Sequence, residues 1–328
     1  MTNKENSLRI LRFDNPERVV AGLPCHVMAY HGVNHQALDD PQSSEDGHNR
    51  PAGEVWYDIW ATGWVKEQAE YMGFPKFPPL DEPEKLKDYV WPNPDNPLIC
   101  DKIHRSAAVF DKTCDCFLAG SHRDTLWEKA YMLVGMENMM MYFYTEPDFA
   151  KEVLHGIMNF QLGIAKHYLE EGIEVANCGD DWGTQSSLLF SPQIIEEFLL
   201  PEYKRLFSLY KGNGVLINFH SCGHIEPAVK YFIELGIDVI NPVQVTANDL
   251  AAVYEKTNGK LSIAGAVSTA LIMDGPIEDI EPTVRDAIRL LGKTGGYFCA
   301  PDQGMNFPEA TYRAYQDALE KHCRYPID

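Results

Sequence analysis

A histidine and a cysteine two positions apart form the pair in this sequence best suited to binding a metal ion. His220 and Cys222 belong to the stretch 220–223 (His-Ser-Cys-Gly), which follows the apolar run 215–219. Side chains alternate along a strand, so a strand through this run projects both residues from one face. Imidazole and thiolate suit zinc, which in catalytic sites takes three protein ligands and keeps a fourth position open. The pair therefore predicts two zinc ligands, and the alternative is a hydrogen-bonded core histidine beside a buried thiol.

Cys299 is the first candidate for the third ligand. It lies in the stretch 295–301, which is expected to hold the last strand of the chain. In a barrel, this strand and the strand ending near His220 both direct side chains at the axis. One imidazole and two thiolates leave bound Zn²⁺ formally uncharged, yet able to polarise an oxygen or to hold a reactive thiolate. The alternative for Cys299 is a buried core thiol.

The elements that must position these ligands are short apolar runs alternating with longer helical patterns, which is typical of parallel βα units. We expect strands at 25–31, 56–61, 116–121, 174–179, 215–222, 239–243, 261–266 and 297–301. Eight such strands predict an α/β protein with a single (β/α)8 TIM barrel over residues 1–328 and an N-terminal extension. Residues 32–54 and 67–115 are rich in Pro, Asp and Gly. We expect them to form irregular insertions, either long loops covering the C-terminal mouth of the barrel or peripheral and oligomer contacts.

Polar side chains follow three of the expected strands. The catalytic candidates are Asp180 and Asp181, two adjacent carboxylates directly after the strand at 174–179. The alternative for either residue is turn formation or helix capping. Because barrel active sites are built at strand ends, the other polar residues there are expected to bind substrate. These residues are Trp182, Gln185, Asn241, Gln244, Asp302 and Gln303.

The composition limits the partners of the protein. The chain has 328 residues and a formal net charge of -20 at pH 7. This acidic balance argues against nucleic acid and against an anionic membrane surface. The sequence contains no run of membrane-spanning length, and its start lacks the apolar segment of a signal peptide. The 8 cysteines lack the dense spacing of a secreted disulfide scaffold, so we expect a cytoplasmic protein with reduced thiols.

Several segments resemble the uroporphyrinogen decarboxylase superfamily, specifically its corrinoid-dependent methyltransferase branch. They are 178–185 (Cys-Gly-Asp-Asp-Trp-Gly-Thr-Gln), 191–192 (Ser-Pro), 220–223, 241–244 (Asn-Pro-Val-Gln) and 295–297 (Gly-Gly-Tyr). The resemblance implies a (β/α)8 barrel with zinc at its C-terminal mouth, held by a His-x-Cys pair and a later cysteine. Carried over to this sequence, the pair falls on His220 and Cys222.

The third ligand departs from the pattern of this branch. In the methyltransferases that pass methyl groups to thiols, the later cysteine follows an Ala-Pro pair, and Asp302 and Gln303 hold that place here. Either Cys299 serves through a shifted register, or Asp302 or another carboxylate such as Asp180 replaces the cysteine, or the site is incomplete. The N-terminal arginine-containing substrate segment of the decarboxylase is missing from this sequence, which disfavours tetrapyrrole decarboxylation.

The resemblance implies an enzyme that moves a methyl group from a small methylated substrate to the Co(I) corrinoid of a separate corrinoid protein. The sequence has no Asp-x-His-x-x-Gly motif of a corrinoid module, so the corrinoid is expected to arrive in trans. Zinc would stabilise the charge that develops on the leaving heteroatom. We favour a methoxylated aromatic substrate and hence O-demethylation, because Trp56, Trp60 and Trp127 are among the residues that offer an aromatic pocket.

Other functions and assemblies are compatible with the sequence. Within the same class, the alternative is methyl transfer from a methyl-corrinoid to a thiol or to tetrahydrofolate, with zinc activating the thiolate. A different class is a non-catalytic ligand-binding barrel, because a fold does not transmit an activity. A homo-oligomer also fits the sequence.

Overall fold

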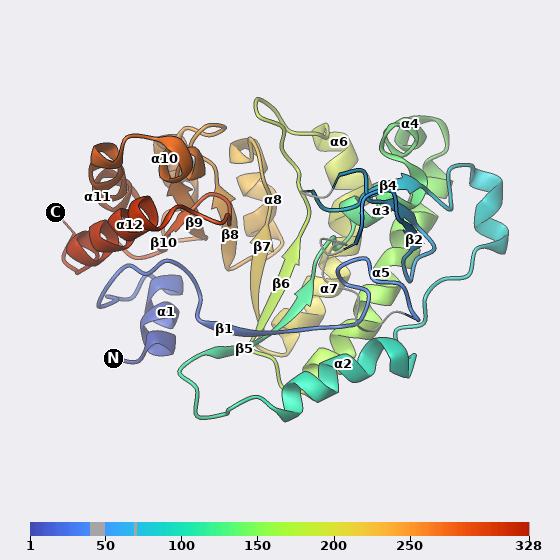
Figure 1. The fold of residues 1–328 in the computed structure, drawn as a ribbon, viewed down its shortest axis with the longest axis horizontal. Helices are drawn as coiled ribbons and strands as arrows, with labels where there is room; N and C mark the ends of the chain where they lie inside the picture. The colour runs from blue at the N-terminus through green and yellow to red at the C-terminus, as the bar shows by residue number, and fades with distance from the viewer. Residues whose placement is uncertain (40–49, 69–70, 328) are drawn as a thin grey trace.

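Seven parallel strands form the central sheet of the protein (Figure 1). The computed structural model describes residues 1–39, 50–68 and 71–327. All neighbouring strands of this sheet run parallel. In their order across the sheet, the strands are β1 (Cys25–Ala29), β5 (Phe117–His122), β6 (Val175–Gly179), β7 (Leu216–His220), β8 (Val239–Val243), β9 (Ser262–Val267) and β10 (Tyr297–Pro301).

The segment before β1 closes this curled sheet into a barrel. Val20 forms a parallel bridge with Phe298 of β10, and its carbonyl accepts a hydrogen bond from the Cys299 amide at 2.9 Å. A few residues later the same segment enters β1, which pairs with β5 at the other side of the sheet. Helix α1 (Asn3–Leu11) precedes this segment as the N-terminal extension. The predicted α/β class and TIM-barrel fold are confirmed.

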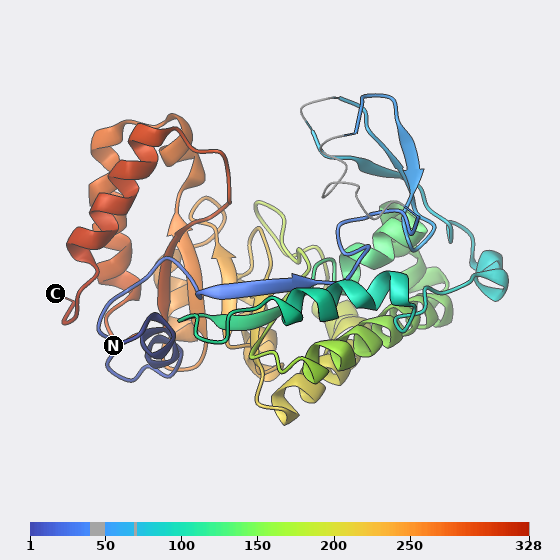
Figure 2. The ribbon, with the colours of Figure 1, turned by 60° about the horizontal axis from the view of Figure 1, so that its bottom comes forward.

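The strand predicted at 56–61 is not part of the barrel, and this prediction was wrong. Its first residues form β2 (Val55–Tyr57), which pairs antiparallel with β3 (Gly63–Val65), and β3 pairs antiparallel with β4 (Phe74–Phe77). Figure 2 shows this small sheet standing apart from the barrel strands. Asp58 turns the chain back after β2 by accepting hydrogen bonds from two amides of the next loop. A short apolar run does not reveal which sheet it joins.

The predicted insertion at 67–115 carries more regular structure than expected. Part of the insertion 32–54 lies outside the described residues. The segment 67–115 contains β4, the 3-10 helix η2 (Pro83–Asp88) and the α-helix α2 (Pro97–Ala108). Asn96 caps α2 by accepting a hydrogen bond from an amide of its first turn, and a proline occupies the start of the helix. This cap and proline are ordinary helix start signals.

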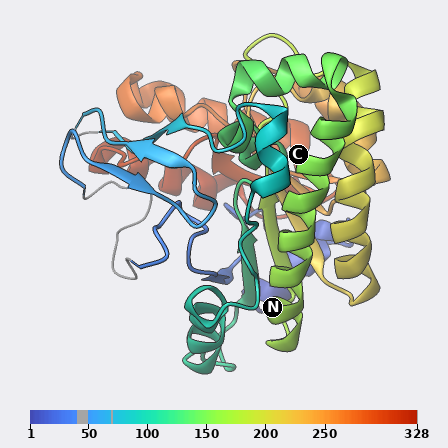
Figure 3. The ribbon, with the colours of Figure 1, turned by 90° about the vertical axis from the view of Figure 1, so that its right-hand side faces the viewer.

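Helices alternate with the strands and pack on the outside of the barrel, and Figure 3 shows α5 alongside α7. The largest apolar cluster lies between these helices and the sheet. Among the described residues, no helix is long and apolar enough to cross a bilayer. The remaining helices are α3 (Trp127–Val134), α4 (Met136–Thr145), α5 (Pro147–Glu170), α6 (Pro192–Ile194), η3 (Ile195–Leu199), α7 (Leu200–Gly212), η4 (Glu226–Ala228), α8 (Val229–Glu234), α9 (Leu250–Thr257), α10 (Thr269–Asp274), η5 (Ile277–Asp279), α11 (Ile280–Leu291) and α12 (Glu309–His322).

The expectation of reduced thiols is corrected at one pair of cysteines. Cys114 and Cys116 form a disulfide in the loop between α2 and β5. The other cysteines are free thiols. Two cysteines one residue apart do not form the spaced framework by which disulfide-rich domains are recognised in a sequence.

Candidate metal centre

Asp181 joins His220 and Cys222 in one cluster at the C-terminal end of the barrel sheet. One ligand atom from each residue lies within 4.8 Å of the other two. The Cys222 Sγ lies 3.3 Å from His220 Nε2, and Asp181 Oδ1 lies 3.5 Å from the same nitrogen. Strand β7 ends at His220, so Cys222 lies in the following turn and not on the strand as predicted. A nitrogen, a sulfur and an oxygen ligand are the kind of set that leaves a fourth position of zinc open.

Two glycines bring Asp181 next to Cys222. Gly223 has a φ of +83°, and a Cβ on it would lie 2.4 Å from the carbonyl carbon of Gly183. A Cβ on Gly183 would in turn lie 2.6 Å from the amide nitrogen of His224. The loops after β6 and β7 therefore pack backbone against backbone, which only glycine permits. Where these two loops meet, Asp181 Oδ1 accepts a hydrogen bond from the Cys222 amide at 2.8 Å.

A row of three asparagines inside the barrel orients His220. Asn218 Nδ2 donates a hydrogen bond to Asn177 Oδ1 at 2.9 Å, and Asn241 Nδ2 donates to Asn218 Oδ1 at 2.7 Å. The row presents Asn241 Oδ1 to His220 Nδ1 at 3.3 Å. Because this oxygen can only accept, His220 donates from Nδ1, and its Nε2 carries a lone pair towards the other two ligands. A hydrogen bond at the second ring nitrogen is what orients metal-binding histidines in general.

The sulfur of Cys222 has its own hydrogen-bond donor. Gln303 Nε2 lies 2.8 Å from Cys222 Sγ. Burial and the nearby Asp181 carboxylate raise the pKa of the thiol to about 12, and the contact with Gln303 lowers it. Without a cation Cys222 is therefore a neutral thiol at pH 7, whereas coordination to a metal ion would deprotonate it.

A cavity of about 560 Å³ opens in front of the three ligands. This volume lies in the range of small-molecule sites. Burial and the carboxylates of Asp124, Asp180 and Asp181 raise the pKa of Glu128, on the cavity wall, to about 10. Glu128 is therefore protonated at neutral pH and able to donate a proton. The lining residues are Met72, Ser121, Arg123, Asp124, Glu128, Asn177, Cys178, Gly179, Asp181, His220, Cys222 and Gln303.

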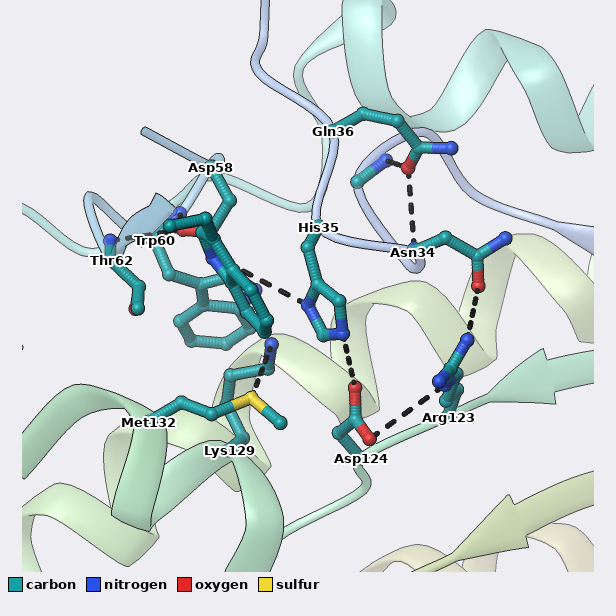
Figure 4. A network of polar contacts seen from close by, with 12 residues as sticks. Asn34, His35, Gln36, Asp58, Trp60, Thr62, Arg123, Asp124, Lys129 and Met132 are labelled. Atoms are coloured by element: carbon teal, nitrogen blue, oxygen red, sulfur yellow. Dashed lines mark hydrogen bonds and ion pairs between the residues drawn. The ribbon is translucent and has the colours of Figure 1, made fainter. Parts of the chain in front are cut away.

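A buried polar network fixes the small sheet at the mouth of the barrel (Figure 4). His35 Nε2 lies 3.2 Å from Asp124 Oδ2, and His35 Nδ1 lies 4.0 Å from Asp58 Oδ2. The imidazole stacks on Trp64 of β3 with ring centroids 3.9 Å apart, and the indole donates to Asp58 at 3.0 Å. Burial lowers the pKa of His35 well below its usual value, so the ring is neutral. Because Asp124 lines the cavity, the network places His35, from the insertion at 32–54, at the active end of the barrel, which fits the first of the two expectations for the long loops.

Cys299 does not lie in the cluster. Phe298 and Ala300, its neighbours on β10, line a cavity with Asn218 and Asn241 of the asparagine row inside the barrel. Since side chains alternate along a strand, Cys299 points to the opposite, helix-covered side. There it is 0% exposed in the apolar core, and burial raises the pKa of its thiol to about 12. The structure therefore removes Cys299 from the candidate ligands and brings Asp181 into their cluster instead.

Asp180 and Asp302 are buried hydrogen-bond acceptors outside the cavity. Asp180 accepts from the amides of Leu126 and Glu128 at 2.8 and 2.7 Å, at the start of α3, and from a tyrosine hydroxyl. Burial raises its pKa to about 7. Asp302 Oδ1 accepts from the Thr269 amide at the start of α10, at 2.9 Å. Both carboxylates thus hold helix starts, which corrects their expected roles in catalysis, in metal binding and, for Asp302, in substrate binding.

Besides Asp302, four of the predicted substrate-binding residues do not line the cavity. One of them, Asn241, instead orients His220. Trp182 is 0% exposed and packs among other buried aromatic rings. Gln185 is exposed on the loop after β6. Gln244 Oε1 accepts a hydrogen bond from the Gly223 amide at 2.5 Å and so supports the turn after Cys222. Their expected role is corrected from substrate binding to orienting His220, packing and loop support, except for Gln185, for which the structure gives no contact.

Three charged residues of the cavity were missed in the sequence. Arg123 and Asp124 directly follow β5, so the rule applied to the ends of three other strands would have found them. Glu128 lies in the first turn of α3. Its burial depends on how α3 packs on the barrel, and no local pattern marks it.

Comparison with known proteins identifies the family. Residues 125–321, more than half of the chain, match the family Uroporphyrinogen decarboxylase (URO-D). The chain belongs to this family, and its predicted place in the uroporphyrinogen decarboxylase superfamily is confirmed.

A solved methyltransferase structure shows the same fold at low sequence identity. The chain is similar to a methyltransferase from Methanosarcina mazei, with a TM-score of 0.70 and 17% identity over 98% of this chain and 99% of that one. A B12-independent methionine synthase from Shewanella sp. W3-18-1 matches with a TM-score of only 0.42 and 11% identity, over 67% of this chain and 63% of that one. In sequence, no curated protein matches the chain.

Proposed function

We propose that this protein is a zinc-dependent methyltransferase that moves a methyl group from a small methylated compound to the Co(I) corrinoid of a separate protein. The observation that carries the proposal is the cluster of Asp181, His220 and Cys222 at the mouth of a URO-D barrel, facing a cavity of small-molecule size. The fold shared with the Methanosarcina mazei methyltransferase over nearly the whole chain supports methyl transfer.

The three side chains fit a zinc ion by type, charge and arrangement. His220 offers a lone pair from Nε2, and Asp181 and Cys222 offer a carboxylate and a thiolate within reach of it. Two anionic ligands and one neutral ligand balance the charge of Zn²⁺, which suits a partly buried site. When bound there, zinc would supply a Lewis acid for the heteroatom that gives up its methyl group.

Three residues around the candidate ligands, Asn241, Gln303 and Glu128, supply hydrogen bonds and a proton. Asn241 keeps the hydrogen of His220 on Nδ1, and Gln303 donates to the sulfur of Cys222. In the proposed transfer, the bond between methyl carbon and heteroatom would break with its electron pair left on the heteroatom, and the methyl group would pass to the corrinoid, whose Co(I) would supply the electron pair of the new bond. Glu128, which is protonated at neutral pH in the metal-free site, would provide the proton that the leaving group takes up.

A methoxylated aromatic compound remains our favoured methyl donor. A cavity of about 560 Å³ admits a single substituted ring. The aromatic residues considered for the pocket, Trp56, Trp60 and Trp127, do not line it, so ring stacking on them is not the basis of binding. Arg123 and Ser121 on the wall would instead contact polar substituents of the ring.

The experiment is methyl transfer to free cob(I)alamin, whose absorption spectrum changes when it accepts a methyl group. Zinc-loaded protein is mixed with 2-methoxyphenol, and tetramethylammonium serves as the corresponding amine probe. We expect transfer from 2-methoxyphenol that is lost in Cys222→Ala. The matched control is Cys25→Ala, at a free cysteine on β1 that does not line the cavity.

The other outcomes separate the alternatives. Transfer from tetramethylammonium alone would overturn the aromatic substrate class. Transfer only from methylcobalamin to an added thiol would reverse the direction and support the thiol methyltransferase. If zinc-loaded protein catalyses neither reaction, the methyltransferase proposal fails and the ligand-binding barrel takes its place.

A further inference from the structure

We propose a second metal site on the outside of the barrel, formed by Cys100, His104 and His167. One ligand atom from each residue lies within 4.8 Å of the other two. Cys100 and His104 are four positions apart on α2 and so share one face of this helix. His167 lies in the last turn of α5, which packs along α2 (Figures 1 and 2). We call these three residues the helix cluster. It shares no residue with the cluster of Asp181, His220 and Cys222 at the barrel mouth, which we call the mouth cluster.

Each histidine of the helix cluster contacts a carboxylate with one ring nitrogen. His104 Nδ1 lies 2.6 Å from Glu171 Oε1, and His167 Nε2 lies 3.0 Å from Asp95 Oδ1. An ionised carboxylate can only accept a hydrogen bond, so these two nitrogens carry the hydrogens. In the neutral rings, the opposite nitrogens therefore carry lone pairs, and these nitrogens face each other at 3.3 Å.

Two lone pairs at this distance repel each other unless a cation lies between or beside them. A proton or a metal ion meets this need. The thiol of Cys100 favours the metal ion, because a proton shared by two imidazoles gains nothing from a sulfur ligand. Cys100 is a free thiol, 5% exposed. The side chain of His104 is 36% exposed, so an ion reaches the cluster from solvent.

The donor set selects zinc among common divalent ions. Two imidazole nitrogens and one thiolate are ligands of Zn²⁺, and the carboxylates behind the rings form the carboxylate–histidine arrangement that orients zinc-binding histidines. Glu170 Oε2 lies 3.9 Å from His167 Nδ1 but outside the group of three, so this exposed side chain would have to turn inwards to become a fourth ligand. Four protein ligands make a closed site, which is typical of structural zinc. The ion would join α2 to α5.

The experiment is a titration of metal-free full-length Cys222→Ala with Co²⁺, which replaces zinc and absorbs in the near ultraviolet when bound to thiolate. The Cys222→Ala change removes the sulfur of the mouth cluster. We expect one ion per chain with the thiolate band, and the loss of this band when Cys100→Ala is added. Adding Glu171→Gln instead should weaken cobalt binding about 10–100-fold, as for other residues behind a metal ligand.

The matched control is His155→Ala, at another histidine of α5 whose side chain is 55% exposed, and it should bind cobalt as before. Circular dichroism of each variant shows that it is folded. If Cys222→Ala gives no thiolate band, or if the band survives Cys100→Ala, the proposal is overturned and the two imidazoles share a proton instead. Because the titration reads no methyl transfer, it stands or falls independently of the proposed enzyme activity.

Discussion

The two histidine–cysteine clusters of this chain use similar ligands on different scaffolds. The mouth cluster stands on loops after parallel strands and faces a cavity, with the side chains of His220 and Asp181 42% and 40% exposed. The helix cluster joins two packed helices, and a carboxylate backs each of its imidazoles. Zinc sites with an open position are catalytic and those closed by protein ligands are structural. Under the functions proposed for the two clusters, the scaffold, more than the ligand type, separates a site for chemistry from a site for stability.

The largest effect that this comparison predicts is on methyl transfer. Cys222→Ala should slow transfer to cob(I)alamin by roughly a thousandfold, because a Lewis acid contributes several kcal/mol of transition-state stabilisation. Cys100→Ala in the helix cluster should leave the rate of the folded protein unchanged. Initial rates of the zinc-loaded variants measure both effects. A comparable loss in Cys100→Ala would break the proposed division between the two clusters.

A smaller effect separates two adjacent carboxylates at the mouth. Asp180→Ala should lower the free energy of unfolding of metal-free protein by roughly 3 kcal/mol, because it leaves buried donors at the start of α3 without a partner. Asp181→Ala should change that free energy much less but abolish zinc binding at the mouth. Urea unfolding and zinc content measure the two effects. Equal destabilisation by both variants would show that Asp181 is also a structural residue.

A mutation in the row of asparagines should weaken zinc binding at the mouth cluster alone. Asn241→Ala removes the acceptor of His220 Nδ1, and zinc affinity at the mouth should fall about 10–100-fold. The thiolate band of cobalt in the helix cluster should not change. Competition with a zinc chelator measures the affinity. An unchanged affinity would mean that the row orients His220 no better than water does.

His122 differs from the histidines of the two clusters, because polar side chains of the protein occupy both of its ring nitrogens and leave neither for a metal ion. Nδ1 lies 2.7 Å from Gln161 Oε1, and Nε2 contacts the Tyr210 hydroxyl. Burial lowers its pKa to about 4, below the value of about 6.5 expected in the unfolded chain. Between these two values the unfolded chain binds an extra proton. The stability contributed by neutral His122 is thus complete above about pH 6.5 and is lost progressively towards the folded pKa.

The smallest predicted effect follows from this window. Between pH 6 and pH 5 the wild type should lose about 1 kcal/mol more stability than His122→Gln. Urea unfolding of the metal-free proteins at both pH values measures the difference, and added zinc should not alter it. Equal losses in the two proteins would show that His122 does not cause this pH dependence.

Much of the barrel could be predicted from the sequence, since buried parallel strands are marked by their own apolar runs. The strands at 239–243 and 297–301 have the predicted bounds. The prediction of a barrel strand at 56–61 was wrong because a hairpin strand and a barrel strand have similar sequences over three residues. The closure through Val20 depends on a single bridge, which leaves no pattern in the sequence.

The types of residue in the candidate site could be predicted from the sequence. The face of the sheet on which each residue lies could not. His220 and Cys222 stand out because imidazole and thiolate rarely follow one strand together. Cys299 was misplaced because a shift of one residue moves a side chain to the other face of a sheet. Among the two aspartates, only the backbone contact between Gly183 and Gly223 determines that Asp181 reaches Cys222. Such a contact between distant loops is set by tertiary packing.

The most direct test of the central claim is the zinc content of each chain by elemental mass spectrometry, measured in Cys100→Ala so that the mouth cluster is read alone. We expect one zinc per chain. This zinc should be lost when Asp181→Ala or Cys222→Ala is added and kept when Cys299→Ala is added. A protein that stays free of zinc after zinc is supplied, or that loses it with Cys299→Ala, would contradict the proposed metal centre.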